Sequence, residues 1–151
     1  MKTIQGDLIR LASEGEFELI VHGCNCFGTM GAGIAKGIKA TFPQAYQADR
    51  ATDKGRRDKL GTCSFAEICT NGTSLIVVNA YTQFDWRGSG RKVDYQAVRS
   101  CMEWIRDRFS GKRIGLPKIG AGLAGGDWAI IAAIIDEELA GEDVTLVEYV
   151  P

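Results

Sequence analysis

Two glycine-rich segments carry the residue types from which phosphate sites are commonly built. Gly120–Gly126 follows the apolar run Ile114–Ile119, and Gly28–Gly33 follows a second apolar run, Phe17–His22. Each precedes a helical pattern. A loop of this kind gathers free backbone N–H groups at the positive end of a helix dipole, which favours phosphate. We therefore expect the two loops to hold the two phosphates of a diphosphate, although either loop alone is equally explained as a turn in which glycine permits positive φ.

Thiols and one imidazole form a second candidate group. His22, Cys24 and Cys26 lie close together in the sequence, but a one-residue Cys spacing is not that of a zinc knuckle and no second pair follows at a suitable distance. Five cysteines without a regular framework indicate a reducing compartment in which thiols stay free. We interpret these thiols as small buried hydrophobic residues and expect neither a metal nor a cofactor.

The elements that must position these groups alternate between strands and helices. Strands are predicted at Phe17–Val21, Thr62–Thr70, Ser74–Tyr81, Arg113–Ile119 and Val144–Val150, after a short N-terminal strand that enters Gly6. Helices are predicted at Leu8–Ala12, Ile34–Phe42, Pro43–Asp49, Asp94–Phe109 and Trp128–Leu139. Asn71-Gly72 predicts a hairpin between the second and third of these strands, which makes the sheet mixed. The pattern predicts a three-layer α/β domain with its ligand loops at one edge of the sheet.

Composition limits the possible partners. The chain has 151 residues, of which 45% are apolar and 25% charged, with a net charge of −1, so no bulk electrostatic attraction to nucleic acid or to an anionic membrane is expected. Lys54–Lys59 is a mixed-charge run typical of a solvated loop. Phe84–Lys92 is polar and glycine-rich with two aromatic residues, and predicts a mobile surface loop of the kind that covers ligands. Neither a membrane span nor a signal peptide is recognisable, so we expect a soluble cytoplasmic protein.

Four motifs occur in the order and spacing of a macrodomain. They are Gly6-Asp7-Leu8, His22-Gly23-Cys24-Asn25-Cys26, Met30-Gly31-Ala32-Gly33-Ile34-Ala35 and Pro117-Lys118-Ile119-Gly120-Ala121-Gly122-Leu123. The chain resembles the macrodomain family over nearly its whole length. Within that family it looks most like the branch that contains ADP-ribose-1''-phosphate phosphatases and terminal ADP-ribose protein glycohydrolases. The resemblance implies one macrodomain over residues 1–151, with a three-layer α/β/α fold and a mixed central sheet that binds ADP-ribose in a cleft at one edge.

The resemblance also assigns residues to parts of ADP-ribose. It places Asp7 at the adenine amino group, with the adjoining backbone at Leu8 on the ring; capping of the next helix is the alternative for Asp7. Asn25 and the loop of Met30, Gly31, Ala32, Gly33 and Ile34 approach the distal ribose. Gly120, Ala121, Gly122 and Leu123 wrap the diphosphate. Tyr149 matches a position that often lines the adenine pocket, and an ordinary strand aromatic is the alternative.

The sequence departs from the glycohydrolases of this branch at two positions. They have a lysine at the end of the strand that matches Leu75–Tyr81 and an acidic residue directly after the Gly-x-Gly-Leu of the second loop. This chain has Asn79-Ala80-Tyr81 and Ala124 at these places. The missing lysine argues against a covalent adduct with the sugar aldehyde. Lys118 precedes the loop and is expected to face solvent.

The expected function is hydrolysis of ADP-ribose 1''-phosphate by a monomer. Asn25 would orient the terminal ribose, His22 would donate to a phosphoryl oxygen and Asp127 would position water; a structural histidine and a helix N-cap are the alternatives for the last two. Two other functions remain open: removal of ADP-ribose from modified protein or nucleic acid, and binding without turnover. Nucleic acid is expected only as such a modified substrate.

Overall fold

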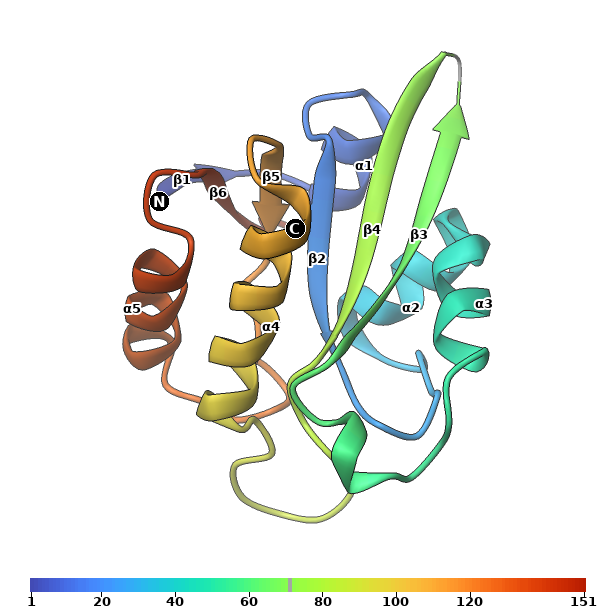
Figure 1. The fold of residues 1–151 in the computed structure, drawn as a ribbon, viewed down its shortest axis with the longest axis vertical. Coiled ribbons are helices and arrows are strands. Elements are labelled where there is room, and N and C mark those ends of the chain that lie inside the picture. The colour runs from blue at the N-terminus through green and yellow to red at the C-terminus, as the bar shows by residue number, and fades with distance from the viewer. Residues whose placement is uncertain (71) are drawn as a thin grey trace.

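The strands form a mixed sheet at the centre of the molecule (Figure 1). The computed structural model describes residues 1–70 and 72–151. The strands are β1 (Lys2–Gln5), β2 (Leu19–Cys24), β3 (Cys63–Thr70), β4 (Thr73–Tyr81), β5 (Arg113–Leu116) and β6 (Asp143–Glu148). Among these residues the sheet has six strands in the order β1-β6-β5-β2-β4-β3. Neighbouring strands are parallel except for the antiparallel pair β3 and β4, so the predicted mixed sheet is confirmed.

Helices cover both faces of this sheet. They are α1 (Leu8–Ser13), α2 (Gly33–Thr41), α3 (Pro43–Arg50), α4 (Tyr95–Phe109) and α5 (Trp128–Glu138), with a short 3-10 helix, η1 (Arg57–Lys59). α4 and α5 bury Met102, Ile105 and Ile135 on one face, and α1 to α3 bury Leu8 and Ile38 on the other. The predicted three-layer α/β/α architecture is confirmed.

Alternating side chains explain why β2 lies in the interior. Leu19 and Val21 point into the core shared with α4 and α5, whereas Ile20 points into the core shared with α1 to α3. A parallel strand covered on both faces requires such a continuous apolar run. β5 ends at Leu116 and not at the predicted Ile119, because Pro117 has no N–H for a ladder hydrogen bond. The predicted hairpin residue Asn71 lies outside the described residues.

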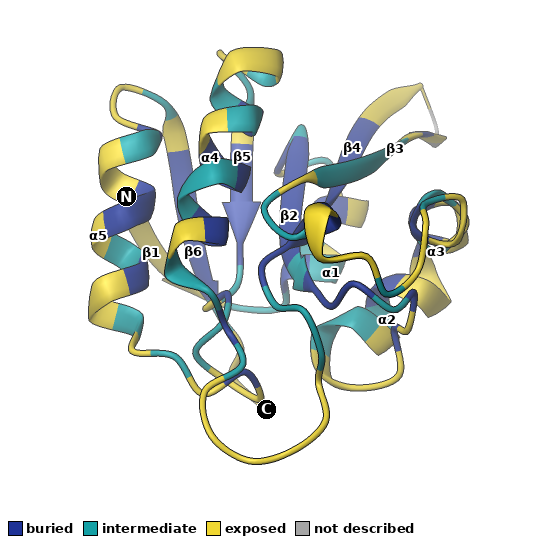
Figure 2. Ribbon diagram, turned by 60° about the horizontal axis from the view of Figure 1, so that its bottom comes forward, coloured by how far each residue is buried: buried dark blue, intermediate teal, exposed yellow. Residues whose placement is uncertain are grey.

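The carboxyl ends of β2, β4 and β5 meet at one edge of the sheet because these strands run parallel. Three loops leave this edge: the first glycine loop (residues 25–32, after β2), the mouth loop (residues 84–92, after β4) and the second glycine loop (residues 117–127, after β5). Figure 2 is turned toward this edge and shows the mouth loop as a long exposed segment. The fold thus brings together loops that lie far apart in the sequence.

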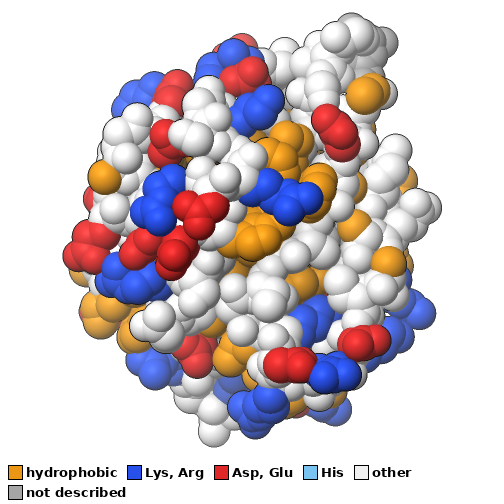
Figure 3. All heavy atoms as spheres, viewed as in Figure 1, with side chains coloured by type: hydrophobic (Ala, Val, Ile, Leu, Met, Phe, Trp, Pro, Cys, Tyr) orange, Lys and Arg blue, Asp and Glu red, His pale blue; other side chains and the backbone are white. Residues whose placement is uncertain are grey.

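The outer surface of α4 and α5 is polar and mixed in charge. Figure 3 shows basic and acidic side chains interspersed on this face. Arg99 lies 2.8 Å from Glu138, and Arg106 lies 3.4 Å from the same carboxylate, which joins the two helices. No helix in residues 1–70 and 72–151 is long and apolar enough to cross a membrane.

Candidate active site

A pocket of about 660 Å³ opens between the two glycine loops. The ends of β2 and β4, the first turn of α2, the two glycine loops and the mouth loop all supply its walls. The predicted site residues that line it are Asn25, Gly31, Ala32, Gly33, Ile34, Gly120, Gly122 and Leu123. The fold therefore brings the two loops to one cavity, as their matching positions after separate strands predict.

The first glycine loop delivers the N-terminus of α2 to this pocket. Gly33, Ile34 and Ala35 form the first turn of the helix and line the cavity. Ala32 is the N-cap residue and makes no side-chain hydrogen bond to this turn. The first backbone N–H groups of a helix have no partner within it, and its dipole is positive at this end. This wall of the pocket therefore suits an anion.

The second glycine loop brings backbone N–H groups without protein acceptors to the pocket wall. The N–H groups of Gly120, Gly122, Leu123 and Ala124 donate to no protein acceptor in the part of the chain that the structure describes, and all four residues line the cavity. The helix after this loop, α5, begins only at Trp128, its first turn is capped by Asp127, and it does not line the cavity. Both loops thus bring residues with free backbone N–H groups to the cavity wall.

Two glycines in these loops are not required by the protein's own geometry. Gly31 and Gly122 have ordinary negative or extended φ, and a Cβ on either would meet no atom within 4 Å. Gly120 differs, since its φ is +73° and a Cβ would lie 2.5 Å from Val93. The open space beside Gly31 and Gly122 leaves the backbone accessible to a ligand.

Asn25 lies in the pocket wall, but its amide is also bound within the first glycine loop. Its Nδ2 donates to the Thr29 hydroxyl at 2.8 Å, and its Oδ1 accepts from the Phe27 N–H at 2.9 Å. These bonds fix the course of the loop. Any role of Asn25 at the ligand is therefore combined with shaping the loop that holds it.

His22 is turned into the protein core and does not line the pocket. Its side chain is fully buried, and its Nε2 lies 2.7 Å from Asn79 Oδ1. Burial lowers the pKa of His22, with hydrogen bonding to Asn79 and the charge of Asp49 opposing that shift. A neutral imidazole held in this way does not face a phosphoryl oxygen in the pocket, and this position corresponds to the structural alternative for the residue.

Asp127 also has a structural role, that of a helix N-cap, which was the alternative to positioning water. It accepts from the Ala129 N–H at 2.9 Å as the N-cap of α5 and is not part of the pocket wall.

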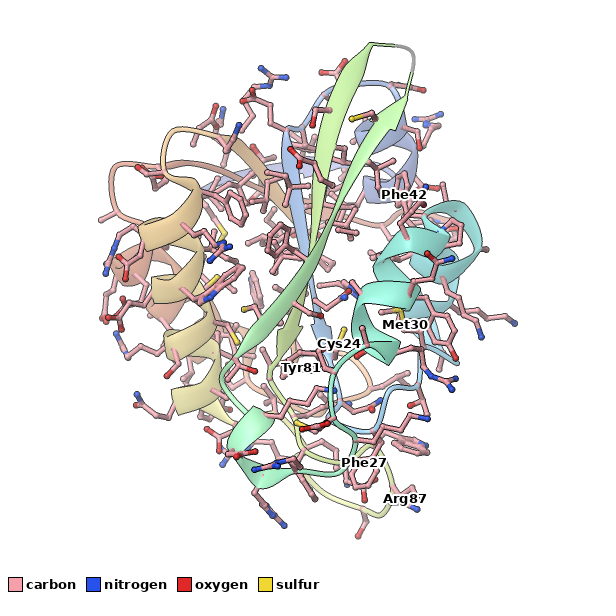
Figure 4. The ribbon with its side chains drawn as sticks, turned by 45° about the vertical axis from the view of Figure 1, so that its right-hand side comes forward. Cys24, Phe27, Met30, Phe42, Tyr81 and Arg87 are labelled. Atoms are coloured by element: carbon pink, nitrogen blue, oxygen red, sulfur yellow. The ribbon has the colours of Figure 1, made fainter. Side chains whose placement is uncertain are left out.

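Met30 and Ala121 belong to loop stretches predicted to touch the ligand, but both pack against the protein core. Figure 4 shows Met30 beside Cys24 and Tyr81, with which it forms a small core.

The adenine-end residues lie outside the pocket wall. Asp7 Oδ1 accepts from the N–H groups of Ile9 and Arg10, which caps α1. Leu8 is buried in the core beneath that helix. Tyr149 follows β6 and is 71% exposed. Their assignment to the adenine ring remains a prediction.

The pocket wall also holds polar and aromatic residues that the sequence did not assign to the site, namely Thr29, Thr82, Gln83, Trp86, Lys92 and Lys118. Lys118 is exposed, as expected, and it also lines the pocket; its Nζ lies 3.8 Å from Glu148. Gln83, Trp86 and Lys92 reach the wall from the end of β4 and from the mouth loop. The place of Trp86 and Lys92 in this wall agrees with the prediction of a ligand-covering loop over Phe84–Lys92. No carboxylate or imidazole from the described residues lines the cavity.

Cys24 lines the pocket as a protonated thiol. Burial raises its pKa well above the ordinary value, and burial also raises the pKa of Cys26 to about 11. Neither is a thiolate at neutral pH, so neither is an activated nucleophile. Within residues 1–70 and 72–151, no three His, Cys, Asp or Glu side chains are arranged to hold a metal ion.

Known proteins resemble the chain in both sequence and fold. A relative from Enterobacteria phage T4, described as an uncharacterised 17.5 kDa protein, is 35% identical over all of this chain and 97% of its own length. A DNA ADP-ribosyl glycohydrolase from Thermus aquaticus is 28% identical over all of this chain, which spans 41% of that protein. An ADP-ribose 1''-phosphate phosphatase from Candida albicans is 24% identical over 89% of this chain and 90% of that protein.

The fold and the family model agree with these relatives. A solved structure of a protein of unknown function from Bacteroides thetaiotaomicron matches 98% of this chain and 96% of its own, with a TM-score of 0.80 and 27% identity. The model of the macro domain family matches residues 21–135. Because that match covers most of the sheet and both glycine loops, the chain belongs to the macro domain family.

Proposed function

We propose that this chain binds the ADP-ribose group in the pocket between its glycine loops and hydrolyses a bond at the distal ribose. The observation that carries the binding step is the presence of free backbone N–H groups in two parts of the pocket wall, one at the start of α2 and one at Gly120, Gly122, Leu123 and Ala124. Neutral donors on both sides of a cavity suit a diphosphate, since each phosphate needs several N–H partners. The open backbone at Gly31 and Gly122 gives the phosphates room to approach.

The distal ribose is expected beside Asn25, Thr82 and Gln83, which all line the pocket. These neutral side chains can hold sugar hydroxyls by hydrogen bonds. Cleavage consumes one water and releases the substituent from the 1'' oxygen or the C1'' carbon. When phosphate is the substituent, water attacks phosphorus and the P–O1'' bond breaks. When a macromolecule is the substituent, water adds a hydroxyl to C1'' and a proton to the departing acceptor.

The sequence favours phosphate as the substituent, because no lysine stands at the end of β4, where the glycohydrolases that this chain resembles have one. Asn79 occupies that part of β4, fully buried, and donates to the Ala45 carbonyl at 2.9 Å. Lys118 and Lys92 in the pocket wall supply positive charge for a phosphoryl group. One specific observation favours a larger substituent as a second candidate: the half-exposed Trp86 lies at the rim of the same pocket, which leaves the mouth open to solvent.

The proposal is tested in two steps. Calorimetry with ADP-ribose, and with ADP and ribose 5-phosphate as controls, should detect binding that requires the whole ligand. Incubation with ADP-ribose 1''-phosphate, with ADP-ribosylated peptide and with ADP-ribosylated oligonucleotide should then release ADP-ribose from at least one substrate. Tight binding without any product would leave a binding module in place of a hydrolase, and absence of binding would remove the proposal altogether.

A further inference from the structure

Strand β3 forms one edge of the sheet, and no strand of the chain pairs with its outer side among the described residues. The strand order places β3 beside β4 and at the opposite end from β1. In Figure 1 it passes in front of β4. β3 has eight residues, of which only Glu67 is charged, and it contains no proline. An edge strand of this kind presents a row of N–H and C=O groups to which another strand can bind.

The ladder between β3 and β4 determines which residues present these groups outward. The Tyr81 N–H donates to the Thr62 carbonyl at 3.0 Å. In an antiparallel pair, residues that bond to the neighbouring strand alternate with residues whose backbone groups point away from it. We call the row of outward groups the β3 edge, and it consists of Cys63, Phe65, Glu67 and Cys69. Among residues 1–70 and 72–151, the β3 edge has no backbone partner.

The other edge of the sheet has two features that prevent pairing with another chain. β1 has only four residues, and Lys2 places a charge on it that lies 3.0 Å from Asp143. Short edge strands and edge lysines are common means of avoiding such pairing. β3 is twice as long and carries no lysine. The comparison therefore favours β3 as the edge that pairs.

An apolar patch and a cation lie next to the β3 edge. The ring centroid of Phe65 lies 5.9 Å from that of Trp104 and 5.3 Å from that of Phe109, both on α4. The Arg108 guanidinium lies 5.2 Å from the Phe65 centroid. Glu67 is exposed and lies on the same face of β3 as Phe65, because side chains two positions apart share a face. In the same view as Figure 1, Figure 3 shows basic side chains beside apolar ones near the middle of the surface.

Two copies of β3 can pair antiparallel in a register that uses the whole β3 edge. When Ala66 lies on the two-fold axis, Phe65 lies opposite Glu67 of the second copy, and Cys63 lies opposite Cys69 of the second copy. Each such pair can exchange two hydrogen bonds. An axis at Glu67 would place two like charges opposite each other and leave Cys63 unpaired, and an axis at Phe65 would leave Cys69 unpaired. The register about Ala66 is therefore preferred.

The same register brings opposite charges together. Side chains directly opposite each other in an antiparallel pair lie on one face of the sheet. Glu67 of one copy would thus lie beside Phe65 of the other, next to the Arg108 guanidinium that packs on that ring. The two-fold axis repeats this contact, as in any isologous interface. Strand pairing and charge therefore favour a second copy of this chain over an unrelated strand.

We propose that two copies of this chain form a dimer by antiparallel pairing of their β3 edges about Ala66. The two sheets then become one continuous sheet, with Glu67 of each copy paired with Arg108 of the other. None of the described pocket-lining residues belongs to β3, so the dimer leaves the pocket of each copy free. The monomer expected from the sequence is the alternative state.

The test is sedimentation equilibrium over a range of chain concentrations, with a reductant present so that the thiols stay free. The native chain should change from monomer to dimer between micromolar and millimolar concentration. Glu67→Pro should remain monomeric, since proline lacks the outward N–H, whereas the ladder to β4 does not use that group. Glu67→Lys and Arg108→Glu should each raise the dissociation constant of the dimer on the order of tenfold. The double variant Glu67→Lys/Arg108→Glu should recover most of this loss.

Glu103→Lys is the matched control, because it makes the same change of charge at an exposed position of α4 about 140° around the helix from Arg108. It should leave the dissociation constant unchanged. Circular dichroism establishes that each variant is folded, and Glu67→Lys, which changes one exposed side chain, decides the question if Glu67→Pro does not fold.

A native chain that stays monomeric up to millimolar concentration would overturn the dimer. Persistence of the dimer in folded Glu67→Pro would also overturn it, because the copies would then associate through another surface. Equal losses in Glu103→Lys and Glu67→Lys would reduce the effect to net charge. A double variant no better associated than the single variants would rule out the contact between Glu67 and Arg108, and with it the register about Ala66.

Discussion

Gly122 tests whether the second glycine loop holds the ligand. A Cβ at this position would meet no protein atom within 4 Å and φ is not positive, so Gly122→Val should fold as the native chain does. The valine methyl groups would occupy the space in which we place a phosphate. We expect ADP-ribose affinity to fall by at least tenfold, with the free energy of unfolding changed by less than about 1 kcal/mol.

The matched control for this variant is Ala140→Val. Ala140 is exposed in the turn that precedes β6, at the opposite edge of the sheet from the pocket. It should leave affinity unchanged in the same calorimetric titration. Native affinity in a folded Gly122→Val protein would show that the ligand does not approach this backbone.

His22 should make stability depend on pH in a defined window. Burial holds its folded-state pKa below the ordinary value of about 6.5, so the unfolded chain takes up a proton first as the pH falls. The free energy of unfolding should therefore decrease below about pH 6.5, by up to about 1.4 kcal/mol per pH unit for this one group. Above that pH the contribution is constant.

The variant His22→Gln keeps a donor for Asn79 Oδ1 and removes the titrating group. Urea unfolding between pH 5 and pH 7.5 should give a flatter pH dependence for the variant, whatever its absolute stability. Parallel curves for the two proteins would mean that His22 does not titrate differently in the folded state.

Among the elements, the connection from α3 to β3 is tied down by a buried ion pair. Lys59 of η1 lies 3.7 Å from Asp49 of α3, and the side chains are 6% and 1% exposed. Tyr81 of β4 donates to Asp49 at 2.7 Å, and the Lys59 ammonium lies 4.2 Å from the Tyr81 ring centroid. Asp49 Oδ2 and Lys59 Nζ have no hydrogen-bond partner among the described residues.

Removing one partner of this pair should lower the free energy of unfolding more than replacing both partners. Lys59→Met leaves a buried carboxylate without its counter-ion and should destabilise the fold by roughly 3–5 kcal/mol. The double variant Asp49→Leu/Lys59→Met should lose less than the sum of its two single variants in urea unfolding. The exposed pair Lys2–Asp143 is the comparison, with an expected coupling below about 1 kcal/mol. Additive losses at Asp49 and Lys59 would rule out this coupling.

The periodic elements were predictable because their signals are local. The helix over Asp94–Phe109 was expected from apolar residues at helical spacing, and the structure places α4 at Tyr95–Phe109. Strand order was not predictable in the same way, since pairing such as β5 with β2 joins residues nearly a hundred positions apart. The sequence also did not predict which loop side chains point into the core and which point outward. Met30 lies in a ligand-type motif but points into the core, because a loop has no period from which to infer its inner face.

On the scale of the whole molecule, the sequence predicted the position of the site better than it predicted the residues that line it. Two glycine loops after parallel strands must meet at one edge, and the pocket lies there. Lys118 and Trp86 became visible as wall residues only in three dimensions. The sequence made His22 a candidate for contact with a phosphoryl oxygen because it ends an apolar run. The strand continues to Cys24, however, and the imidazole is buried.

Leu123 should contribute to the heat-capacity change of ADP-ribose binding, which calorimetry can measure. Its side chain is 82% exposed and reaches toward the first glycine loop, where a Cβ on Gly33 would lie 3.7 Å from its Cδ1. A ligand held between the loops would shield this apolar surface from water, and such burial makes the heat-capacity change of association negative. The enthalpy of ADP-ribose binding should thus become more exothermic as temperature rises, with a shallower slope in Leu123→Ala.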